Sequence, residues 1–464
     1  MIPLLTSHEM RSVERQAIET WGISSLVLQE HAAIGALGLI PTGVPLQVLV
    51  GPGNNGGDAL ALARLARLGG HEVTVWSPMA EPEWHGDAAT QAQLWRGMGG
   101  VIHTATRPTE LVPSWRGWVV DGFFGLGSAR PLAPPFTDWV QAVNAASLPV
   151  LALDLPSGLH PDLAEVPGEA IQATLTACFG ARKVCHGLLP ARELCGEVHL
   201  VSIPLGPLPL ASLALLERPA LSPRAWDTHK GSFGHVAIRA GSLGMSGAAV
   251  LAALGALRTG AGLVTVLTDP EVRAEIAAQI PEAMVRPWHG TVPEGVDVLL
   301  VGPGGVSQVP DWDGPLVLDA SALRQGEGRR WMDRPGTAIT PHPGEFARLF
   351  RLPRPLLVDE RLAQVRQVSQ GRAGVLLLKG AQSLIGGGGQ DAVWANTTGH
   401  PGLATGGSGD FLAGMVAGFR AQGLPMREAV ATATWFHGAA ADRLPGAGLI
   451  PRDLAAVLPE LLRA

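Results

Sequence analysis

Short apolar segments alternate with helical segments along almost the whole chain, and this alternation constrains the fold more than any other feature. Each apolar segment of the first half is followed by Gly, Pro or Asp and then by a helical pattern. The strands expected there are 48–50, 73–76, 117–120, 150–153 and 198–201. Such alternation is typical of a doubly wound, Rossmann-like parallel sheet. Ligands bind such sheets at the carboxyl ends of the strands, so polar residues that follow a strand are candidates for a site.

The second half repeats the alternation and predicts another α/β domain. Its expected strands are 235–239, 263–267, 298–301, 316–318, 338–340 and 375–378, and its helices include 246–257 and 344–350. Residues 206–228 are rich in Pro, Leu and Ser and show no clear period. A length of 464 residues suits two domains better than one. We therefore expect domains at 1–205 and 229–464, joined by a linker at 206–228.

Composition excludes several classes of protein. The net charge is −6 and the basic residues are not clustered, so nucleic-acid binding is not expected. The most apolar long window, 248–267, is interrupted by Arg258 and several glycines and does not suit a membrane span. Cys178, Cys185 and Cys195 are odd in number and lack CxxC spacing. They are expected to be reduced packing residues of a cytoplasmic protein, without a disulfide or zinc site.

Lysine is rare in this chain. Lys183, Lys230 and Lys379 are the only lysines among 34 basic residues, and tyrosine is absent. This pattern suggests a base-composition bias that replaces Lys by Arg wherever the structure allows. A lysine that remains would then lie where a compact ammonium fits and a planar guanidinium does not. Lys379 follows the expected strand 375–378, where it could meet a nucleotide, and Lys230 precedes another strand. Chance survival of three lysines is the alternative.

The segment 405–410, Thr-Gly-Gly-Ser-Gly-Asp, is the most informative motif for function. Its glycines let backbone N–H groups turn inward, and an apolar helical pattern follows from Phe411. Together these features form a cradle for phosphate. A carboxylate at the mouth of an anion site is best explained if Asp410 takes a proton from a hydroxyl that attacks a phosphoryl group. The alternative is that Asp410 only caps the helix.

A second glycine-rich loop, 51–58, lies between an expected strand at 46–50 and an expected helix at 59–67. Strand, glycine loop and helix follow one another in nucleotide-phosphate sites. One such loop is weak evidence. Two loops that each end in Asp predict two small-molecule sites, both of which bind phosphates.

Three oxygen-bearing side chains follow strands of the first half. Asn55, Asp121 and Ser157 offer an amide oxygen, a carboxylate and a hydroxyl. An all-oxygen set suits a hard cation, and one carboxylate with neutral ligands suits a monovalent ion such as potassium. Turns and caps at strand ends are the alternative.

Two further turns carry polar residues. The segment 121–131 contains several glycines and ends near Arg130, which could bind a phosphate. In the segment 340–345, His342 lies between two prolines and precedes a helix. A fixed ring that contacts substrate and a rigid turn with a surface His are equally consistent with this pattern.

Taken together, these motifs resemble two enzyme families. The first half resembles the NAD(P)H-hydrate epimerase domain in segments 22–30, 51–58, 121–131 and 154–158. The second half resembles the ADP-dependent NAD(P)H-hydrate dehydratase, which has a ribokinase-like fold, in segments 229–234, 241–249, 302–304, 341–345, 379–381 and 402–410. The matches run in order over nearly the whole chain, as in the fused bacterial nicotinamide nucleotide repair enzymes.

The resemblance implies roles for individual residues. In the first domain the hydrated dinucleotide would contact Asn54, Asn55, Gly56, Gly57, Asp58, Gly125, Leu126, Gly127, Ser128, Ala129, Arg130, Pro131 and Asp154. Potassium would be bound by Asn55, Asp121 and Ser157. In the second domain the hydrate would contact Ala248, Gly304, His342 and Asp410, and the adenine nucleotide would contact Lys379, Gly380, Ala381, Gln382, Ser383 and Gly409.

The resemblance also implies the reaction and its ligands. NADHX and NADPHX are hydrated reduced nicotinamide nucleotides that carry a hydroxyl on ring carbon C6. The second domain would convert the S epimer to NAD(P)H with ADP and magnesium, Asp410 acting as base. The first would interconvert the R and S epimers, and Asp121 is our hypothesis for its acid/base group. A cytoplasmic homo-oligomer is expected.

Some positions depart from the family pattern, and two other functions stay open. His31, Ala59, Ser321 and His400 replace residues that are common in these families, none of which is assigned to chemistry. The second domain could instead be a ribokinase-like kinase of a small hydroxylated metabolite, with a regulatory first domain. The first domain could also be a binding module without catalysis. The choice between ADP and ATP stays open as well.

Overall fold

The computed structural model describes the chain except for residues 80–83, 106–107, 128–129, 445 and 464. The chain forms two compact units, Pro3–Leu213 and Ala214–Ala464, and the second also includes Met1–Ile2. The division between them falls inside the segment 206–228 that we expected to be a linker. No helix among the described residues is long and apolar enough to cross a membrane.

The first unit is built on a parallel sheet with the strand order β4-β3-β2-β5-β6-β7-β9. Its strands are β2 (Leu46–Val50), β3 (Val73–Ser77), β4 (Ile102–Thr104), β5 (Trp118–Gly122), β6 (Val150–Leu153), β7 (Leu175–Phe179) and β9 (Glu197–Val201). In a separate short ladder, β1 (Ile2–Leu5) pairs with β8 (Arg182–Lys183), and Leu5 lies opposite Lys183. The predicted doubly wound α/β fold is confirmed for this unit.

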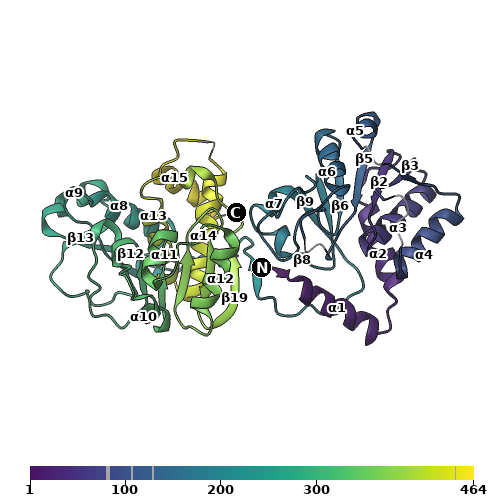
Figure 1. Ribbon diagram of the computed structural model, residues 1–464. Coiled ribbons are helices and arrows are strands. Elements are labelled where there is room, and N and C mark those ends of the chain that lie inside the picture. The colour runs from purple at the N-terminus through teal and green to yellow at the C-terminus, as the bar shows by residue number, and fades with distance from the viewer. Residues whose placement is uncertain (80–83, 106–107, 128–129, 445, 464) are drawn as a thin grey trace. The chain divides into compact units, whose positions relative to one another are not determined.

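Helices cover both faces of this sheet, as Figure 1 shows. They are α1 (Ser7–Glu19), α2 (Ser25–Leu37), α3 (Asn54–Leu68), α4 (Gly86–Gly97), α5 (Pro108–Leu111), α6 (Phe136–Ala145) and α7 (Ala191–Leu194). Alanines and leucines of α2 and α3 pack on one face of the sheet, and Trp139 and Val140 of α6 pack on the other. The two apolar layers hold the carboxyl ends of β2, β5 and β6 in fixed positions.

The second unit is built on strands in the order β13-β12-β11-β14-β15-β16-β17-β18-β19. They are β11 (His235–Arg239), β12 (Leu263–Thr268), β13 (Met284–Pro287), β14 (Val298–Val301), β15 (Leu316–Leu318), β16 (Thr337–Ile339), β17 (Val375–Leu378), β18 (Leu384–Gly387) and β19 (Gln390–Ala395), with the short β10 (Leu213–Leu215) before them in the chain. Pairing is parallel up to β17, whereas β18 and β19 are antiparallel. The sheet is therefore mixed, with an antiparallel hairpin at β18–β19.

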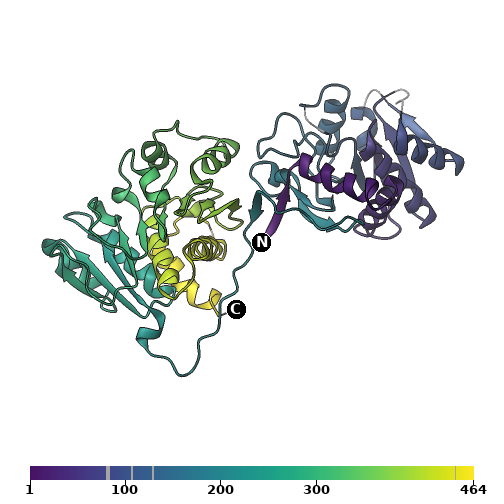
Figure 2. The same cartoon turned by 90° about the horizontal axis from the view of Figure 1, so that it is seen from below.

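Helices surround this sheet as well, and Figure 2 shows them from below. They are α8 (Ser246–Arg258), α9 (Arg273–Gln279), α10 (Gly328–Asp333), α11 (Pro343–Phe350), α12 (Val358–Ser369), α13 (Ser408–Ala421), α14 (Met426–Asp442) and α15 (Pro451–Leu461). Buried residues of α8, α13 and α14 form one core with those of β11, β12 and β14. The close packing of α8 on α13 depends on glycine, because a Cβ at Gly255 would lie 2.2 Å from the carbonyl oxygen of Phe411.

Two expected helix starts were wrong. Helix α3 begins at Asn54 and α13 at Ser408, whereas the sequence predicted glycine loops up to Asp58 and Asp410. Asp410 therefore lies in the first turn of α13, and Asp58 is the fifth residue of α3. Glycine has low helix propensity, but tertiary packing overrides that preference in both runs. Strands β1, β4, β7, β8, β10, β13, β18 and β19 were also not predicted.

Candidate active sites

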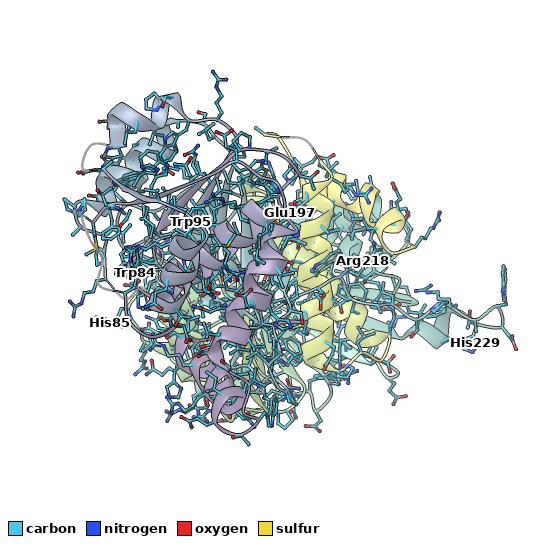
Figure 3. The ribbon with its side chains drawn as sticks, turned by 90° about the vertical axis from the view of Figure 1, so that its right-hand side faces the viewer. Trp84, His85, Trp95, Glu197, Arg218 and His229 are labelled. Carbon is cyan, nitrogen blue, oxygen red and sulfur yellow. The ribbon has the colours of Figure 1, made fainter. Side chains whose placement is uncertain are left out.

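The first site is built around the tight connection between β2 and α3. A Cβ at Gly51 would lie 1.9 Å from the Phe123 carbonyl oxygen, and one at Gly56 would lie 2.1 Å from the Gly51 carbonyl oxygen. Only glycine permits such close approaches of two backbone segments. Trp84, labelled in Figure 3, donates from Nε1 to the Gly51 carbonyl oxygen at 3.0 Å and ties the segment before α4 to this turn. The N-terminus of α3 is thus fixed beside the segment that follows β5.

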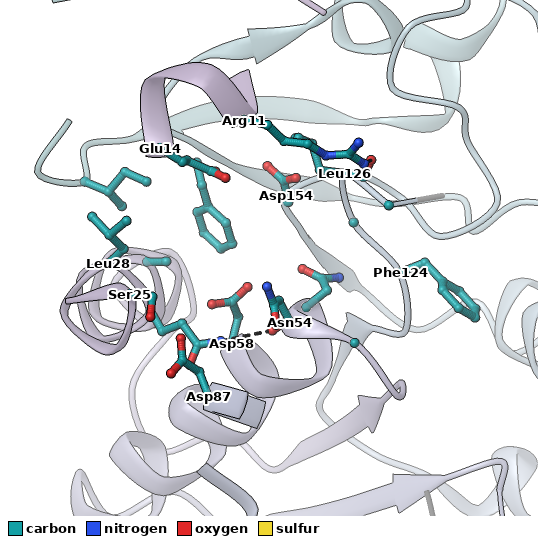
Figure 4. Close-up of a pocket in the computed structure, with 18 of the residues that line it drawn as sticks. Arg11, Glu14, Ser25, Leu28, Asn54, Asp58, Asp87, Phe124, Leu126 and Asp154 are labelled. Atoms are coloured by element: carbon teal, nitrogen blue, oxygen red, sulfur yellow. Dashed lines mark hydrogen bonds between the residues drawn. The ribbon is translucent and has the colours of Figure 1, made fainter. Parts of the chain in front are cut away.

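A cavity of about 560 Å³ opens at this connection (Figure 4). Its walls include residues of α1, α2, α3, α4 and β7, the connection between β2 and α3, the segment after β5, the residue that follows β6, and Ile203. Its described polar lining consists of Arg11, Glu14, Ser25, Gln29, Asn54, Asn55, Asp58, Asp87 and Asp154. Four carboxyl groups and one guanidinium therefore surround one space, which is an environment that perturbs pKa values.

Most of the predicted hydrate contacts line this cavity, namely Asn54, Asn55, Asp58, Gly125, Leu126, Gly127 and Asp154. Gly56, Gly57, Arg130 and Pro131 are not among the described lining residues, and Ser128 and Ala129 lie outside the part of the chain that the structure describes. Sequence reasoning missed Arg11 and Glu14, which α1 brings to the site, where Arg11 donates to the Leu126 carbonyl oxygen at 3.1 Å. No motif near Arg11 or Glu14 in the sequence indicated that these residues reach the site.

Asp121 and Ser157 meet beneath the cavity, as predicted from their positions after β5 and β6. The Ser157 hydroxyl donates to Asp121 Oδ1 at 2.6 Å, and the Ser157 amide donates to Oδ2 at 2.8 Å. The Phe124 amide in turn donates to the Ser157 hydroxyl at 2.9 Å. Burial raises the pKa of Asp121 to about 6, although hydrogen bonds from Ser157 and Phe123 partly oppose this effect. Asp121 itself is fully buried and is not among the described residues that line the cavity.

Asn55 reaches the same segment and has unused hydrogen-bonding capacity. Its amide nitrogen and oxygen are both buried, and neither has a hydrogen-bond partner. A Cβ at Gly125 would lie 3.2 Å from Asn55 Oδ1, so the amide group lies against this turn. A buried amide without partners is costly and calls for a ligand. No group of three or more His, Cys, Asp or Glu side chains in the described part of the chain could hold a metal ion.

Asp154 has two unusual features. Its backbone φ is +64°, a left-handed conformation that a side chain bearing a Cβ rarely adopts. Its carboxylate forms a buried ion pair with Lys183, whose ammonium also donates to the Phe179 carbonyl oxygen at 2.9 Å. Burial opposes the charge of Lys183, but attraction to Asp154 prevails and raises the pKa of the ammonium. The pair therefore places a fixed carboxylate on the wall of the cavity.

The second site lies where α13 begins. Asp410 is in the first turn of this helix, and the Ser408 hydroxyl is 3.3 Å from His437 Nε2. Burial, followed by the negative charge of Asp319, raises the pKa of Asp410 to about 7, although Lys379 partly opposes the shift. A carboxyl group with a pKa near neutrality is matched to proton transfer at physiological pH.

Lys379 and Asp319 form an ion pair beside this turn. Lys379 Nζ lies 2.8 Å from Asp319 Oδ1, which also accepts from the Thr340 hydroxyl at 2.8 Å. A Cβ at Gly409 would lie 3.1 Å from the Lys379 ammonium, so the start of α13 faces this lysine directly. Lys379 and Gly409 thus come together as predicted. Asp319 was not predicted, although its position directly after β15 was a usable signal.

The remaining predicted residues of this unit fall into separate groups. Ser242 donates to the Gly304 carbonyl oxygen at 2.8 Å, which joins that turn to the loop before α8, the helix of Ala248. His342 caps α11, since its Nδ1 accepts from the Gly344 amide at 3.0 Å, and its ring is exposed. Gly380, Ala381, Gln382 and Ser383 connect β17 to β18. A Cβ at Gly380 would lie 2.1 Å from Arg361 Nη1.

Comparison with known proteins assigns both units. Residues 25–185 match the YjeF-related protein N-terminus family, and residues 236–460 match the NAD(P)H-hydrate dehydratase family. A bifunctional NAD(P)H-hydrate repair enzyme from Coxiella burnetii is 35% identical, with 96% of this chain and 95% of that protein covered. This chain belongs to the bifunctional NAD(P)H-hydrate repair enzyme family.

A second relative agrees with this assignment. The family member from Escherichia coli is 31% identical over 98% of this chain and 93% of its own length. The chain is also similar to a solved structure titled as an ADP/ATP-dependent NAD(P)H-hydrate dehydratase from Bacillus subtilis, co-crystallised with ATP and Mg²⁺. That structure is 31% identical, its match covers 52% of this chain and 94% of its own chain, and the TM-score is 0.47.

Proposed function

We propose that this protein repairs hydrated nicotinamide nucleotides in two steps. Its first unit interconverts the R and S epimers of NADHX and NADPHX, and its second unit dehydrates the S epimer with ADP, giving NAD(P)H, AMP and phosphate. The observation that carries the proposal is that both halves match the repair enzymes over nearly the whole chain. The sites support it, because each half places a carboxyl group with a raised pKa within the first five residues of a helix.

The dehydration chemistry follows from the surroundings of Asp410. Hydroxide is a poor leaving group, whereas phosphate is a good one. The Asp410 carboxylate takes the proton of the C6 hydroxyl as its oxygen attacks the terminal phosphoryl group of the nucleotide. The backbone N–H groups at the start of α13 stabilise the charge on the transferred group. The ring nitrogen then expels phosphate from C6 and restores the reduced nicotinamide.

Lys379 is suited to hold the nucleotide phosphates beside this turn, because its ammonium faces Gly409. Asp319 keeps that ammonium charged and in place at 2.8 Å. Magnesium bound to the phosphates would neutralise part of their charge. We assign Gly380, Ala381, Gln382 and Ser383 to the adenine nucleotide and Ala248, Gly304 and His342 to the hydrate.

The oxygen groups beneath the first cavity are suited to potassium. Asn55 has a buried amide oxygen without a partner, and it lies against the turn that follows Asp121. Asp121 adds one negative charge and Ser157 a neutral oxygen, a set that favours a monovalent ion. Potassium would fix this turn and the phosphates bound beside it. The acid/base role of Asp121 stays a prediction.

The proposal also includes a location in the cytoplasm and assembly into a homo-oligomer. All three cysteines are buried and free, which suits the reducing cytoplasm. Assembly into a homo-oligomer is expected from the family and can be measured by light scattering.

The deciding experiment mixes the purified protein with racemic NADHX, magnesium, potassium and either ADP or ATP and follows the absorbance of reduced nicotinamide. Full recovery of NADH with ADP establishes both activities and the phosphate donor. Recovery that stops at half shows dehydration without epimerisation and refutes the role of the first unit. No recovery with either nucleotide refutes the proposal and favours a ribokinase-like kinase.

A further inference from the structure

The buried ion pair of Asp154 and Lys183 is placed for chemistry. A left-handed conformation at a residue other than glycine costs on the order of 1 kcal/mol, and such strain is concentrated at functional sites. Here it turns a carboxylate toward the cavity at the end of β6. The ammonium that holds it is fully buried and lies 4.0 Å from Cys178 Sγ and 2.9 Å from the Phe179 carbonyl oxygen.

Asp58 faces the same cavity from a different element, α3, of which it is the fifth residue (Figure 4). Burial, followed by the charge of Asp154, raises the pKa of Asp58 well above its usual range. The raised pKa of Asp58 favours its protonated form, whereas the Asp154 carboxylate forms the ion pair with Lys183. Two carboxyl groups with such different surroundings around one cavity are suited to paired acid and base catalysis.

We infer that Asp154 and Asp58 are the base and acid that interconvert the epimers, and that Lys183 is the residue that positions Asp154. This inference rests on the proposed function of the first unit. It deepens that proposal, because it assigns the proton transfers to residues on the cavity wall.

The chemistry balances without any further reagent. The Asp154 carboxylate takes the proton of the C6 hydroxyl, the C6–N1 bond breaks as the C6 carbonyl forms, and N1 receives a proton from Asp58. Rotation about the C5–C6 bond presents the opposite face of the aldehyde to N1. The N1 electron pair then attacks C6, the new hydroxyl takes its proton from Asp154, and N1 returns its proton to Asp58. Both carboxyl groups end in their starting states.

Asp121 is less suited to this task. Three hydrogen bonds from Ser157 and Phe123 occupy its two oxygens. It is fully buried and lies outside the described lining of the cavity. We therefore place Asp121 beneath the reacting group, as a ligand of the cation.

The test uses the full-length protein, the pure R epimer of NADHX and potassium, without ADP, and measures the appearance of the S epimer by chromatography. For Asp154→Asn and Asp58→Asn we expect kcat to fall about 100-fold or more, the contribution typical of one acid or base, with little change in KM. Glu72→Gln, an exposed carboxylate of the same unit, is the matched control and should behave like wild type. Dehydration of the S epimer with ADP should be unchanged in all of them.

Lys183 is tested by a double-mutant cycle. Lys183→Met should lower kcat less than Asp154→Asn does, and the double variant should be no slower than Asp154→Asn alone. Near-ultraviolet circular dichroism checks that the contacts among Trp76, Trp115 and Trp139 of the first unit are retained. If the double variant lost as much of kcat as the two single variants combined, Lys183 would not act through Asp154, and its positioning role would be overturned.

Two results would overturn the acid and base assignment. One is a kcat for Asp154→Asn within tenfold of wild type. The other is a raised KM with unchanged kcat, which would make Asp154 a binding contact only. A wild-type protein that does not interconvert the epimers would instead refute the proposed function of the unit, and this outcome is distinct because it precedes any mutation.

Discussion

The rate of dehydration should depend on pH through Asp410. Burial and the charge of Asp319 raise the pKa of this carboxyl to about 7. The base is active only when ionised, so kcat/KM should be constant well above pH 7 and fall as the pH drops through that value. About one tenth of the groups are ionised one pH unit below the pKa and about nine tenths one unit above it. The expected ratio of rates across that interval is therefore about tenfold.

Asp319→Asn should shift the fall in kcat/KM, the acid limb of the pH–rate profile, to lower pH. The substitution removes the negative charge that disfavours ionisation of Asp410. It also leaves the Lys379 ammonium without its carboxylate partner at 2.8 Å, so that the positive charge acts more fully on Asp410. Both changes favour the ionised carboxyl, and they act in the same direction. The nucleotide KM should rise in the same variant, because Lys379 loses the group that orients it.

The assay measures NADH formation from the S epimer under limiting hydrate, with saturating ADP and magnesium, between about pH 5.5 and 8.5, an interval that brackets the expected pKa. Glu294→Gln, an exposed carboxylate in the same unit, is the matched control and should keep the wild-type profile. A wild-type acid limb near the ordinary carboxyl range, about pH 4, would refute the argument from burial. An unchanged limb in Asp319→Asn would refute the argument from charge.

Three further substitutions test other parts of the structure. Arg427→Leu should lower the free energy of unfolding by about 3 kcal/mol in denaturant titrations. The reason is that the Arg427 guanidinium donates to the carbonyl oxygens of Gly387 and Ala392 and lies over Trp394. A loss under about 1 kcal/mol would contradict this. Gly56→Ala should abolish epimerisation and leave dehydration intact, since its Cβ would lie 2.1 Å from a carbonyl oxygen; normal epimerisation would show that the turn can relax. Asp121→Asn should nearly abolish R-to-S conversion, and the residual rate should no longer depend on potassium over sodium; a wild-type rate would refute any essential role.

The sequence predicted best those features that depend on local order along the chain. Asp121 and Ser157 each follow a strand, and neighbouring parallel strands end at the same edge of a sheet, so their meeting could be predicted. Their hydrogen bonds at 2.6 and 2.8 Å confirm that they lie together. Helix starts were harder to predict, because Gly56 and Gly409 resemble loop residues until the packing around them is known.

The missed residues depend on contacts across long distances in the sequence. Arg11 and Glu14 reach the first cavity only because α1 lies over it, and no motif near them indicates a ligand. The hairpin β18–β19 was missed because a run of glycines hides its alternation, and Arg427, far along the chain, is needed to satisfy its carbonyl groups. His31, a departure from the family pattern, is exposed and is not among the described residues of the cavity.

The rare lysines link the sequence to both sites. Lys183 and Lys379 each pair with an aspartate that follows a parallel strand, Asp154 after β6 and Asp319 after β15. The Lys183 ammonium donates to the Asp154 carboxylate and to the Phe179 carbonyl oxygen, two acceptors that one ammonium can serve and a planar guanidinium serves less well. The Lys379 ammonium donates to Asp319 Oδ1. Lys230 is exposed, so its retention has no such explanation. The fully buried Lys183 and the partly buried Lys379 thus mark the carboxylates that set the charge of the two sites, whereas the exposed Lys230 marks none.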